Sequence, residues 1–282
     1  MHAAASPQLT SLADTVEIAP GVAINRLGLG TYRAGEGSDV EGEVRYGLSI
    51  GYRTIDTAAL YANEGSVGRI LRESGLARDE VFVTTKLWNN DQGYDSTLRA
   101  FDGSLGRLGF DYVDLYLVHW PSPEKMRETW RAMEEIHASG RARAIGVCNF
   151  LVHHLETLGG LANVPPALNQ FEHHPRLQQP ELVEYCQGHG ITVQAWAPIM
   201  RGRVLLIPEL VQIAQAHGKT PAQVSIRWIL QRGVTTIPKS IHERRLAENA
   251  DVYDFELTGA EMAIIESLDR AERIGPDPDR YA

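Results

Sequence analysis

The chain has 282 residues, two cysteines and a formal net charge of −9. The acidic balance and the lack of a long Lys/Arg run exclude nucleic acid as the expected partner, because phosphate binding needs a basic face, and two cysteines are too few for a disulfide framework or a structural zinc site. No apolar run approaches the ~18 residues of a membrane helix, so we expect a soluble, cytoplasmic protein that binds a small ligand.

The first 13 residues lack the charged segment and the apolar run of a signal peptide, so we predict a loose amino-terminal tail there. Two short apolar runs follow, Thr15–Ile18 and Val22–Ile24. Pro20 and Gly21 between them are typical turn residues. The pattern predicts a β-hairpin that precedes the main fold and covers its floor.

Residues 26–31 predict a strand, and Gly28 and Gly30 within it invite comparison with dinucleotide-binding loops. The comparison fails because Arg33 stands where the third glycine of G-x-G-x-x-G would fall. No helix begins directly after Gly30 either, so the context of a Rossmann fold is missing.

From residue 39 onward, helical spacing of apolar residues alternates with short apolar runs typical of strands. Helices connecting successive strands enforce parallel pairing, so eight alternations predict one (β/α)8 TIM barrel over residues 1–282. An extra helix begins at Thr258, and an irregular tail over residues 270–282 is expected near the substrate pocket. The seven later strands are predicted at 53–56, 81–86, 113–119, 144–149, 167–172, 191–196 and 235–238, and their helices at 39–50, 66–75, 94–108, 124–139, 151–161, 180–186 and 220–231.

Chemically active side chains stand at the ends of three successive strands: Asp56 and Tyr61 after one, Lys86 and His119 at the next two. In a parallel barrel these ends share one face, where catalytic residues are expected. The Lys86 ammonium would lower the pKa of the Tyr61 phenol, Asp56 would hold Lys86, and neutral His119 would orient a carbonyl oxygen, so that Tyr61 donates a proton. The alternatives are a structural Asp-Lys pair and a histidine satisfied within the core.

Stretches of sequence that match a known protein family run from Gly28 to Asp269. They include Asp56-Thr57-Ala58-Ala59, Thr85-Lys86-Leu87-Trp88, Asp111-Tyr112-Val113-Asp114, Ile145-Gly146-Val147-Cys148-Asn149-Phe150, Asn169-Gln170 and Ile237-Pro238-Lys239-Ser240. Together they resemble the aldo-keto reductase family, in particular bacterial-type members such as the 2,5-diketo-D-gluconate reductases. The resemblance implies a barrel that binds NADPH in extended form and transfers hydride to a carbonyl, with Asp56, Tyr61, Lys86 and His119 as catalytic tetrad.

The resemblance also assigns residues to the nicotinamide end of the cofactor. Asn149 and Gln170 would hold the carboxamide, and Trp196 would stack on the ring where the family often has tyrosine. Cys148 stands where serine is usual, and a thiol is the weaker hydrogen-bond partner. The remaining cofactor contacts expected at this end are Gly30, Thr31 and Asp56.

At the phosphate end, barrels often bind phosphate at the loops after strands 7 and 8. Arg201 and Arg203 lie in the first of these loops and suit a pyrophosphate, or they are solvated loop charges. The second loop and its helix, which opens near Glu243, would read the 2′-phosphate and the adenine, unless their charges are ordinary surface charges. The residues expected there are Lys239, Ser240, Arg245, Glu248 and Asn249.

Three aromatic residues, Tyr32, Trp88 and Trp120, lie beside the tetrad in sequence. With His119 they are expected to line the substrate pocket, although they could also be packing at the barrel mouth. The pairs His153-His154 and His173-His174 have no carboxylate or cysteine at a known ligand spacing, so no metal is expected.

The leading hypothesis is a monomeric, NADPH-dependent reductase of small aldehydes, ketones, dicarbonyls or keto-sugars. A second is an aldolase in which Lys86 forms a Schiff base and Tyr61 shuttles protons. A third is a non-catalytic interaction module that keeps the fold and NADPH. The intact tetrad disfavours the third hypothesis.

Overall fold

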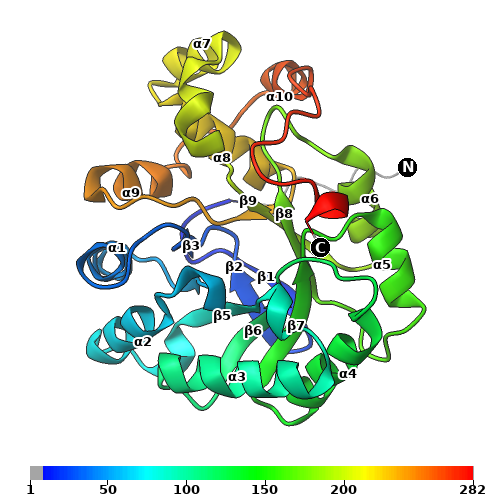
Figure 1. The fold of residues 1–282 in the computed structure, drawn as a ribbon. Coiled ribbons are helices and arrows are strands. Elements are labelled where there is room, and N and C mark those ends of the chain that lie inside the picture. Colours follow the sequence, from blue (N-terminus) through cyan, green and yellow to red (C-terminus); the bar gives the residue numbers. More distant parts are fainter. Residues whose placement is uncertain (1–8, 282) are drawn as a thin grey trace.

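A ring of parallel strands surrounded by helices forms the body of the protein, seen end-on in the computed structural model, which describes residues 9–281 (Figure 1). Neighbouring strands follow one another in chain order, and each pair is parallel. The strands are β3 (Leu29–Gly30), β4 (Thr54–Asp56), β5 (Phe82–Leu87), β6 (Val113–Val118), β7 (Ala142–Cys148), β8 (Leu168–Glu172), β9 (Thr192–Trp196) and β10 (Thr235–Thr236).

Backbone hydrogen bonds between the first and last strands close the ring. The amide of Gly28 donates to the carbonyl of Thr236 at 2.9 Å, and the amide of Thr236 donates to the carbonyl of Arg26 at 2.9 Å. A parallel bridge joins Leu27 to Thr236. Every edge is thereby paired, as a closed barrel requires. The predicted (β/α)8 barrel is confirmed, although β3 and β10 have only two residues each.

The helices follow the predicted order with small shifts at their ends. Their apolar faces turn toward the strands, as Val40 and Val44 of the first helix illustrate, because both are fully buried. No helix among residues 9–281 is long and apolar enough to cross a membrane. The helices are α1 (Ser38–Ser49), α2 (Glu64–Glu73), α3 (Tyr94–Leu108), α4 (Met126–Ala138), α5 (Val152–Gly159), α6 (Pro180–Gly188), α7 (Pro208–His217), α8 (Pro221–Gln231), α9 (Glu243–Ala250) and α10 (Gly259–Glu266).

Helix α7 was not predicted. Its signal is present in the sequence, because Pro208 stands at the first helical position and Leu210, Ile213 and Ala214 bury one face at helical spacing. The extra carboxyl-terminal helix was predicted correctly. It is α10, whose Thr258 and Glu261 form a capping box at its start.

The predicted hairpin is present as β1 (Thr15–Ala19) and β2 (Val22–Asn25), paired antiparallel. Ile18, Val22 and Ile24 are buried against side chains from inside the barrel, among them Leu115 and Leu168. This packing closes the end of the barrel opposite the carboxyl ends of the strands.

The expected loose tail over residues 1–13 needs a correction where the structure describes it. Leu9 is buried in the main core, the amide of Ser11 donates to Asp14, and the carbonyl of Leu12 accepts from Asn25 Nδ2 at 3.0 Å. Apolar burial and hydrogen bonds therefore hold residues 9–13 on the barrel. Residues 1–8 lie outside the described part of the chain.

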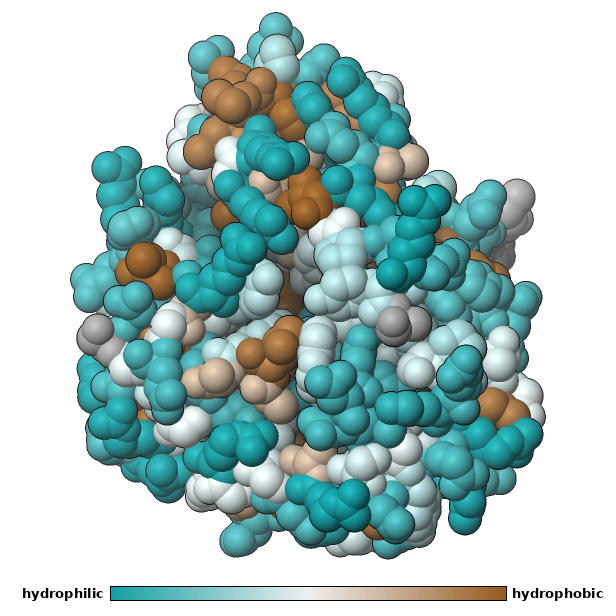
Figure 2. Space-filling view, viewed as in Figure 1, coloured by the Kyte–Doolittle hydropathy of each residue, from teal (hydrophilic) through white to brown (hydrophobic). Residues whose placement is uncertain are grey.

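After α10 the chain turns back across the barrel. Residues 271–281, drawn in red in Figure 1, pass in front of the carboxyl ends of the strands and finish with a short 3₁₀ helix, η5 (Pro278–Arg280). We call this segment the C-terminal tail. The space-filling view of the same face shows a hollow near the centre of the molecule, next to this segment (Figure 2).

Candidate active site

Asp56, Tyr61 and Lys86 meet at the carboxyl ends of β4 and β5. Lys86 lies on β5 and is fully buried. Its Nζ donates to Asp56 Oδ1 at the end of β4 (2.5 Å), to the carbonyl of Thr57 (2.9 Å) and to the Tyr61 hydroxyl (3.4 Å). Tyr61 follows β4 on a single 3₁₀ turn, η1 (Ala59–Tyr61). The structure therefore brings together three of the four predicted residues, from the ends of two neighbouring strands.

Charge is balanced within this group. Burial alone would lower the pKa of Lys86, but the Asp56 carboxylate outweighs it and holds that pKa above its ordinary value. The enclosure of Tyr61 raises the pKa of its phenol, and Lys86 only partly opposes that rise. Lys86 thus has the expected lowering effect on the phenol pKa, but burial is the larger effect and the net pKa is raised.

His119 completes the group at the end of β6. Its ring meets that of Tyr61 edge-on, with 5.7 Å between centroids. Burial and then the Lys86 charge hold the pKa of His119 well below its usual range, so the ring is neutral. Its Nδ1 is buried and has no hydrogen-bond partner among residues 9–281. A neutral imidazole has one donor and one acceptor nitrogen, and His119 lines the cavity, so it can hydrogen-bond a ligand there.

The predicted nicotinamide residues lie beside this group. Asn149 adopts a left-handed conformation with φ 62°. Its Nδ2 donates to the carbonyl of His119 at 2.9 Å, and its Oδ1 accepts from Trp196 Nε1 at 2.8 Å. Gln170 Nε2 donates to Asp56 Oδ2 at 2.8 Å. Amides, indole and tetrad therefore form one connected network.

Three residues in this region are buried behind the surface that a ligand would touch. Cys148 is buried, with its Sγ 3.9 Å from Gln170 Oε1, and Thr31 donates its hydroxyl to the carbonyl of Asp56 at 3.0 Å. Gln194 was missed by sequence reasoning, although it accepts from Gln170 Nε2 at 2.8 Å. A signal existed, because Gln194 precedes Trp196 by two positions and so points to the same side of β9.

A cavity of 680 Å³ runs from the tetrad to the loop after β10 and to α9. Gly30 lines it, and a methyl group there would come within 2.8 Å of the carbonyl oxygen of Ile237. At its far end Asn249 is buried, and its Nδ2 has no partner among the described residues. The predicted residues that line the cavity are Gly30, Tyr32, Asp56, Tyr61, His119, Trp120, Asn149, Gln170, Trp196, Arg201, Lys239, Ser240, Arg245, Glu248 and Asn249.

The far end also holds a residue that the sequence did not point to. Glu43 of α1 is buried, and its Oε1 accepts from the amide of Ser240 at 3.2 Å. Burial raises the pKa of Glu43 to about 8, against the opposing charge of Lys239. The loop that carries Lys239 and Ser240 is thus tied to a helix nearly two hundred residues earlier in the chain.

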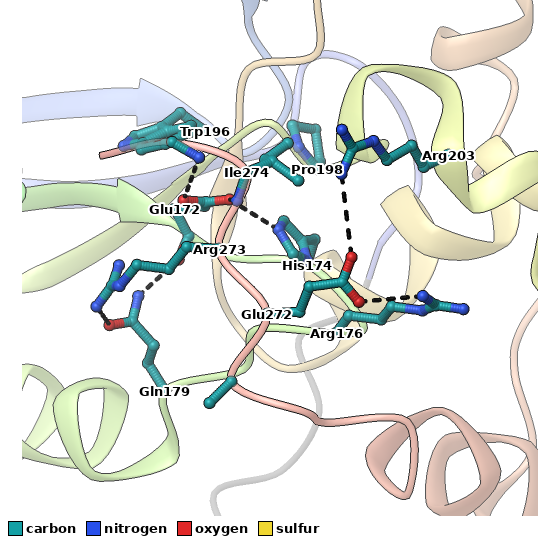
Figure 3. A network of polar contacts seen from close by, with 12 residues as sticks. Glu172, His174, Arg176, Gln179, Trp196, Pro198, Arg203, Glu272, Arg273 and Ile274 are labelled. Carbon is teal, nitrogen blue, oxygen red and sulfur yellow. Dashed lines mark hydrogen bonds and ion pairs between the residues drawn. The ribbon is translucent and has the colours of Figure 1, made fainter. Parts of the chain in front are cut away.

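Only one of the two arginines predicted to contact the pyrophosphate lines the cavity. Arg201 lines the cavity, whereas Arg203 does not. Arg203 points to Glu272 of the C-terminal tail at 4.0 Å (Figure 3). Arg244 was passed over but lines the cavity, and it pairs with Glu248 Oε1 at 2.9 Å. Which arginines line the cavity depends on the direction of each loop, and sequence spacing does not reveal that direction.

The substrate end is aromatic. Tyr32 and Trp120 line the main cavity together with Tyr281 of the C-terminal tail, whose ring lies 4.5 Å from that of Trp120. Trp88 lines a neighbouring cavity instead, and it reaches the site indirectly through its ring contact with His119 at 5.3 Å. The prediction that Trp88 faces the substrate pocket therefore needs this correction.

One group of possible metal ligands appears only in three dimensions. The structure brings Asp279 of the C-terminal tail to His153 Nε2 at 3.0 Å and to His154 Nε2 at 3.5 Å. The amide of Leu151 donates to His154 Nδ1 at 3.2 Å, so the proton of neutral His154 is on Nε2 and faces the carboxylate. The arrangement is that of a hydrogen-bonded contact between α5 and the C-terminal tail.

Comparison with known proteins identifies the class to which this fold and site belong. The model of the aldo/keto reductase family matches residues 26–270, and the chain belongs to that family. It is 52% identical to glyoxal reductase of Bacillus subtilis (strain 168) over 270 residues, which is 96% of this chain and 98% of that protein.

Two solved structures extend the comparison. A Gox0644 variant crystallised in complex with NADPH is 42% identical, with a TM-score of 0.89 over 95% of this chain and 98% of that one. A putative 2,5-diketo-D-gluconic acid reductase B is 37% identical, with a TM-score of 0.85 over 90% and 92% of the two chains. The predicted family and the predicted enzyme class, an NADP-dependent oxidoreductase, are confirmed.

The cavity has the groups that such a dinucleotide needs. Lys239 and Arg245 supply positive charge at one end, and the buried Nδ2 of Asn249 is available there as a donor. Trp196 supplies an aromatic face at the other end, next to the amide of Asn149. The residues therefore fit NADP(H).

Proposed function

We propose that the protein reduces the carbonyl group of small aldehydes, ketones, dicarbonyls or keto-sugars, with NADPH as reductant and Tyr61 as general acid. The supporting observation is the position of Tyr61. Its hydroxyl lies 3.4 Å from Lys86 Nζ, and Tyr61 lines the cavity beside His119. Bound NADPH supplies the hydride.

The side chains of His119 and Tyr61 then orient and protonate the substrate oxygen. His119, neutral because its pKa is held low, donates a hydrogen bond that orients the carbonyl oxygen toward Tyr61. Tyr61 gives its proton to that oxygen as the carbonyl carbon is reduced, and a phenolate remains. Lys86, kept charged by Asp56 at 2.5 Å, stabilises the phenolate. The phenol of Tyr61 carries its proton at neutral pH before the reaction, because its ordinary pKa of about 10 lies well above 7 and burial raises it further.

The nicotinamide end is held by Asn149, Gln170 and Trp196 in this proposal. Asn149 is already oriented by two hydrogen bonds, at 2.9 and 2.8 Å, before any ligand enters. Such preorganisation lowers the cost of binding. Cys148, behind Gln170, contributes a weaker contact than a serine hydroxyl would.

A substrate panel tests the proposal directly. We expect NADPH absorbance to fall with glyoxal, methylglyoxal and aromatic aldehydes, because Tyr32, Trp120 and Tyr281 form an apolar wall with few polar groups. The similarity to glyoxal reductase makes dicarbonyls the first choice, and keto-sugars test the similarity to a diketogluconic acid reductase. No turnover with any of them would contradict the proposal.

The aldolase hypothesis is disfavoured by the environment of Lys86. A Schiff base needs a neutral amine, whereas Asp56 holds the pKa of this buried ammonium above its ordinary value. Borohydride should therefore trap no substrate on Lys86. We also propose a cytoplasmic, monomeric enzyme of one domain, and light scattering should then give the mass of a single chain.

The preference between coenzymes is a further expected result. Arg245 lines the phosphate end and makes no ion pair within residues 9–281. We expect NADPH to bind at least tenfold more tightly than NADH, since charge-assisted hydrogen bonds to the 2′-phosphate are worth about 1.5–3 kcal/mol each. Arg245→Ala should weaken NADPH binding about tenfold and leave NADH binding unchanged, as measured by fluorescence titration.

Arg131→Ala is the matched control for this measurement. Arg131 is an exposed arginine on α4 and does not line the cavity. Arg131→Ala changes the net charge by the same amount as Arg245→Ala, so it reports any general electrostatic effect on coenzyme binding. Equal affinities for the two coenzymes in the wild type, or an unchanged ratio in Arg245→Ala, would contradict the assignment.

A further inference from the structure

A buried carboxylate lies at the root of the C-terminal tail. Glu172 ends β8 and is fully buried. Its Oε1 accepts from the amide of Ile274 at 2.7 Å and from His174 Nε2 at 3.0 Å, and its Oε2 accepts from the amide of Gly275 at 3.1 Å (Figure 3). A buried carboxylate is costly unless its oxygens are satisfied. Here the tail backbone supplies two of the three donors.

Neighbouring contacts fix the same part of the tail. Gln179 Nε2 donates to the carbonyl of Glu172 at 2.7 Å, and Gln179 Oε1 accepts from Arg273 at 3.2 Å. On the other side Arg176 pairs with Glu272 at 3.0 Å, and that pair is more exposed (Figure 3). Residues 272–275 are thus fixed, and the chain beyond them reaches the cavity.

Gly275 lies directly on the indole of Trp196. A methyl group on Gly275 would come within 2.3 Å of Trp196 Cη2, so only a glycine backbone fits. The opposite end of the indole donates from Nε1 to Asn149 Oδ1 at 2.8 Å. Asn149 in turn donates to the carbonyl of His119 at 2.9 Å. Contacts therefore run without a gap from Glu172 through the tail and Trp196 to the tetrad.

We propose that Glu172 is a positioning residue that latches the C-terminal tail onto β8, so that Gly275 holds the Trp196 indole against Asn149. The latch thereby positions two surfaces of the cavity. One is the aromatic face that Trp196 offers to the nicotinamide, and the other is the substrate wall formed by Pro276 and Tyr281. The inference rests on the proposed reductase function for its kinetic consequences only.

The chemistry of Glu172 explains why a carboxylate stands there. Its two oxygens are both acceptors and can receive three N–H donors. A glutamine has one acceptor oxygen and would turn an NH₂ group toward an amide that also donates. Glu172→Gln therefore keeps the size and shape of the side chain and breaks one of the two backbone contacts.

The expected result for Glu172→Gln is a coupled change at both surfaces. KM for the carbonyl substrate should rise about tenfold, and the quenching of tryptophan fluorescence by NADPH should weaken, with a Kd raised several-fold. Amide exchange at Ile274 and Gly275 should quicken at least tenfold, while exchange in β7 stays unchanged. Glu184→Gln is the matched control, because it neutralises an exposed carboxylate on α6 that makes no ion pair within residues 9–281, and it leaves the contacts of the tail intact.

A second variant keeps the test independent of folding. Gly275→Ala pushes mainly on Trp196, because the added methyl group would lie 2.3 Å from Trp196 Cη2 and 3.2 Å from Glu172 Oε2. It should raise KM and weaken quenching in the same way. In the double variant the two effects should not add, since both act through the same indole. A purely structural Glu172 would lower Tm in Glu172→Gln but leave KM, quenching and tail exchange at wild-type values. That outcome, or a wild-type Gly275→Ala, would overturn the proposal.

The readouts separate this inference from the reductase proposal. NADPH quenching and amide exchange need no turnover, so they report the latch even if no carbonyl is reduced. Conversely, loss of tail protection with unchanged KM and unchanged quenching would reject the link to the site while leaving the reductase function in place.

Discussion

Replacing Tyr61 by phenylalanine is expected to lower kcat by about 10²- to 10⁴-fold, the usual contribution of a general acid. The substitution removes the proton that the carbonyl oxygen must receive and keeps the ring that packs beside Tyr32 and His119. NADPH affinity should stay close to that of the wild type. Stopped-flow absorbance and a fluorescence titration would measure the two quantities separately.

Tyr116→Phe provides a control for losing a buried phenol. Tyr116 is fully buried on β6, packs on Phe101, and its hydroxyl has no partner among the described residues. Its removal should leave kcat within about twofold of the wild type, since no proton transfer is lost. If Tyr61→Phe turned over as fast as this control, Tyr61 would not be the acid.

Lys86→Met should cripple turnover to a similar extent, by about 10²-fold or more. The phenolate left on Tyr61 would lose the ammonium 3.4 Å away, and its pKa would rise further. Reduction requires the protonated phenol, so the rate falls as pH rises through that pKa. Burial already raises that pKa far above neutral pH in the wild type, so the fall lies outside the working pH range of the enzyme. The readout is therefore the loss of kcat at neutral pH, measured by stopped-flow absorbance.

The same substitution also threatens stability, because Asp56 would be left buried without its cation. Breaking a buried pair on one side costs about 3–5 kcal/mol. The double variant Lys86→Met with Asp56→Asn removes both charges and should recover much of the unfolding free energy, but not the rate. Wild-type turnover in Lys86→Met, or activity that returned with stability in the double variant, would remove Lys86 from the mechanism.

The sequence by itself determined the barrel and the composition of its candidate catalytic face. Strand and helix signals repeat with short connections, and parallel strands must place all their carboxyl ends on one side. Asp56, Lys86 and His119 each stand at such an end, so their convergence followed from the pattern before any contact was known. The motif matches supplied the family.

Local pattern was less informative between the elements. Helix α7 went unrecognised although its cap and spacing were present, and Arg203 and Trp88 were assigned to surfaces that they do not line. A loop residue's neighbours depend on the direction of the chain around it, and adjacent positions in sequence can face different cavities. Sequence distance to the tetrad therefore predicted cavity lining poorly in these two cases.

Only the tertiary structure determined the pKa values that depend on burial and the contacts that join distant segments of the chain. The pKa of Tyr61 rises because enclosure outweighs Lys86, and no local signal reports enclosure. Glu43 reaches Ser240, and Glu172 reaches the amide of Ile274, each by folding that joins segments at least a hundred residues apart. Side-chain type fixed which chemistry was available. The low-dielectric interior and the path of the chain decided which groups keep a charge or a proton, and which of them hold the tail over the site.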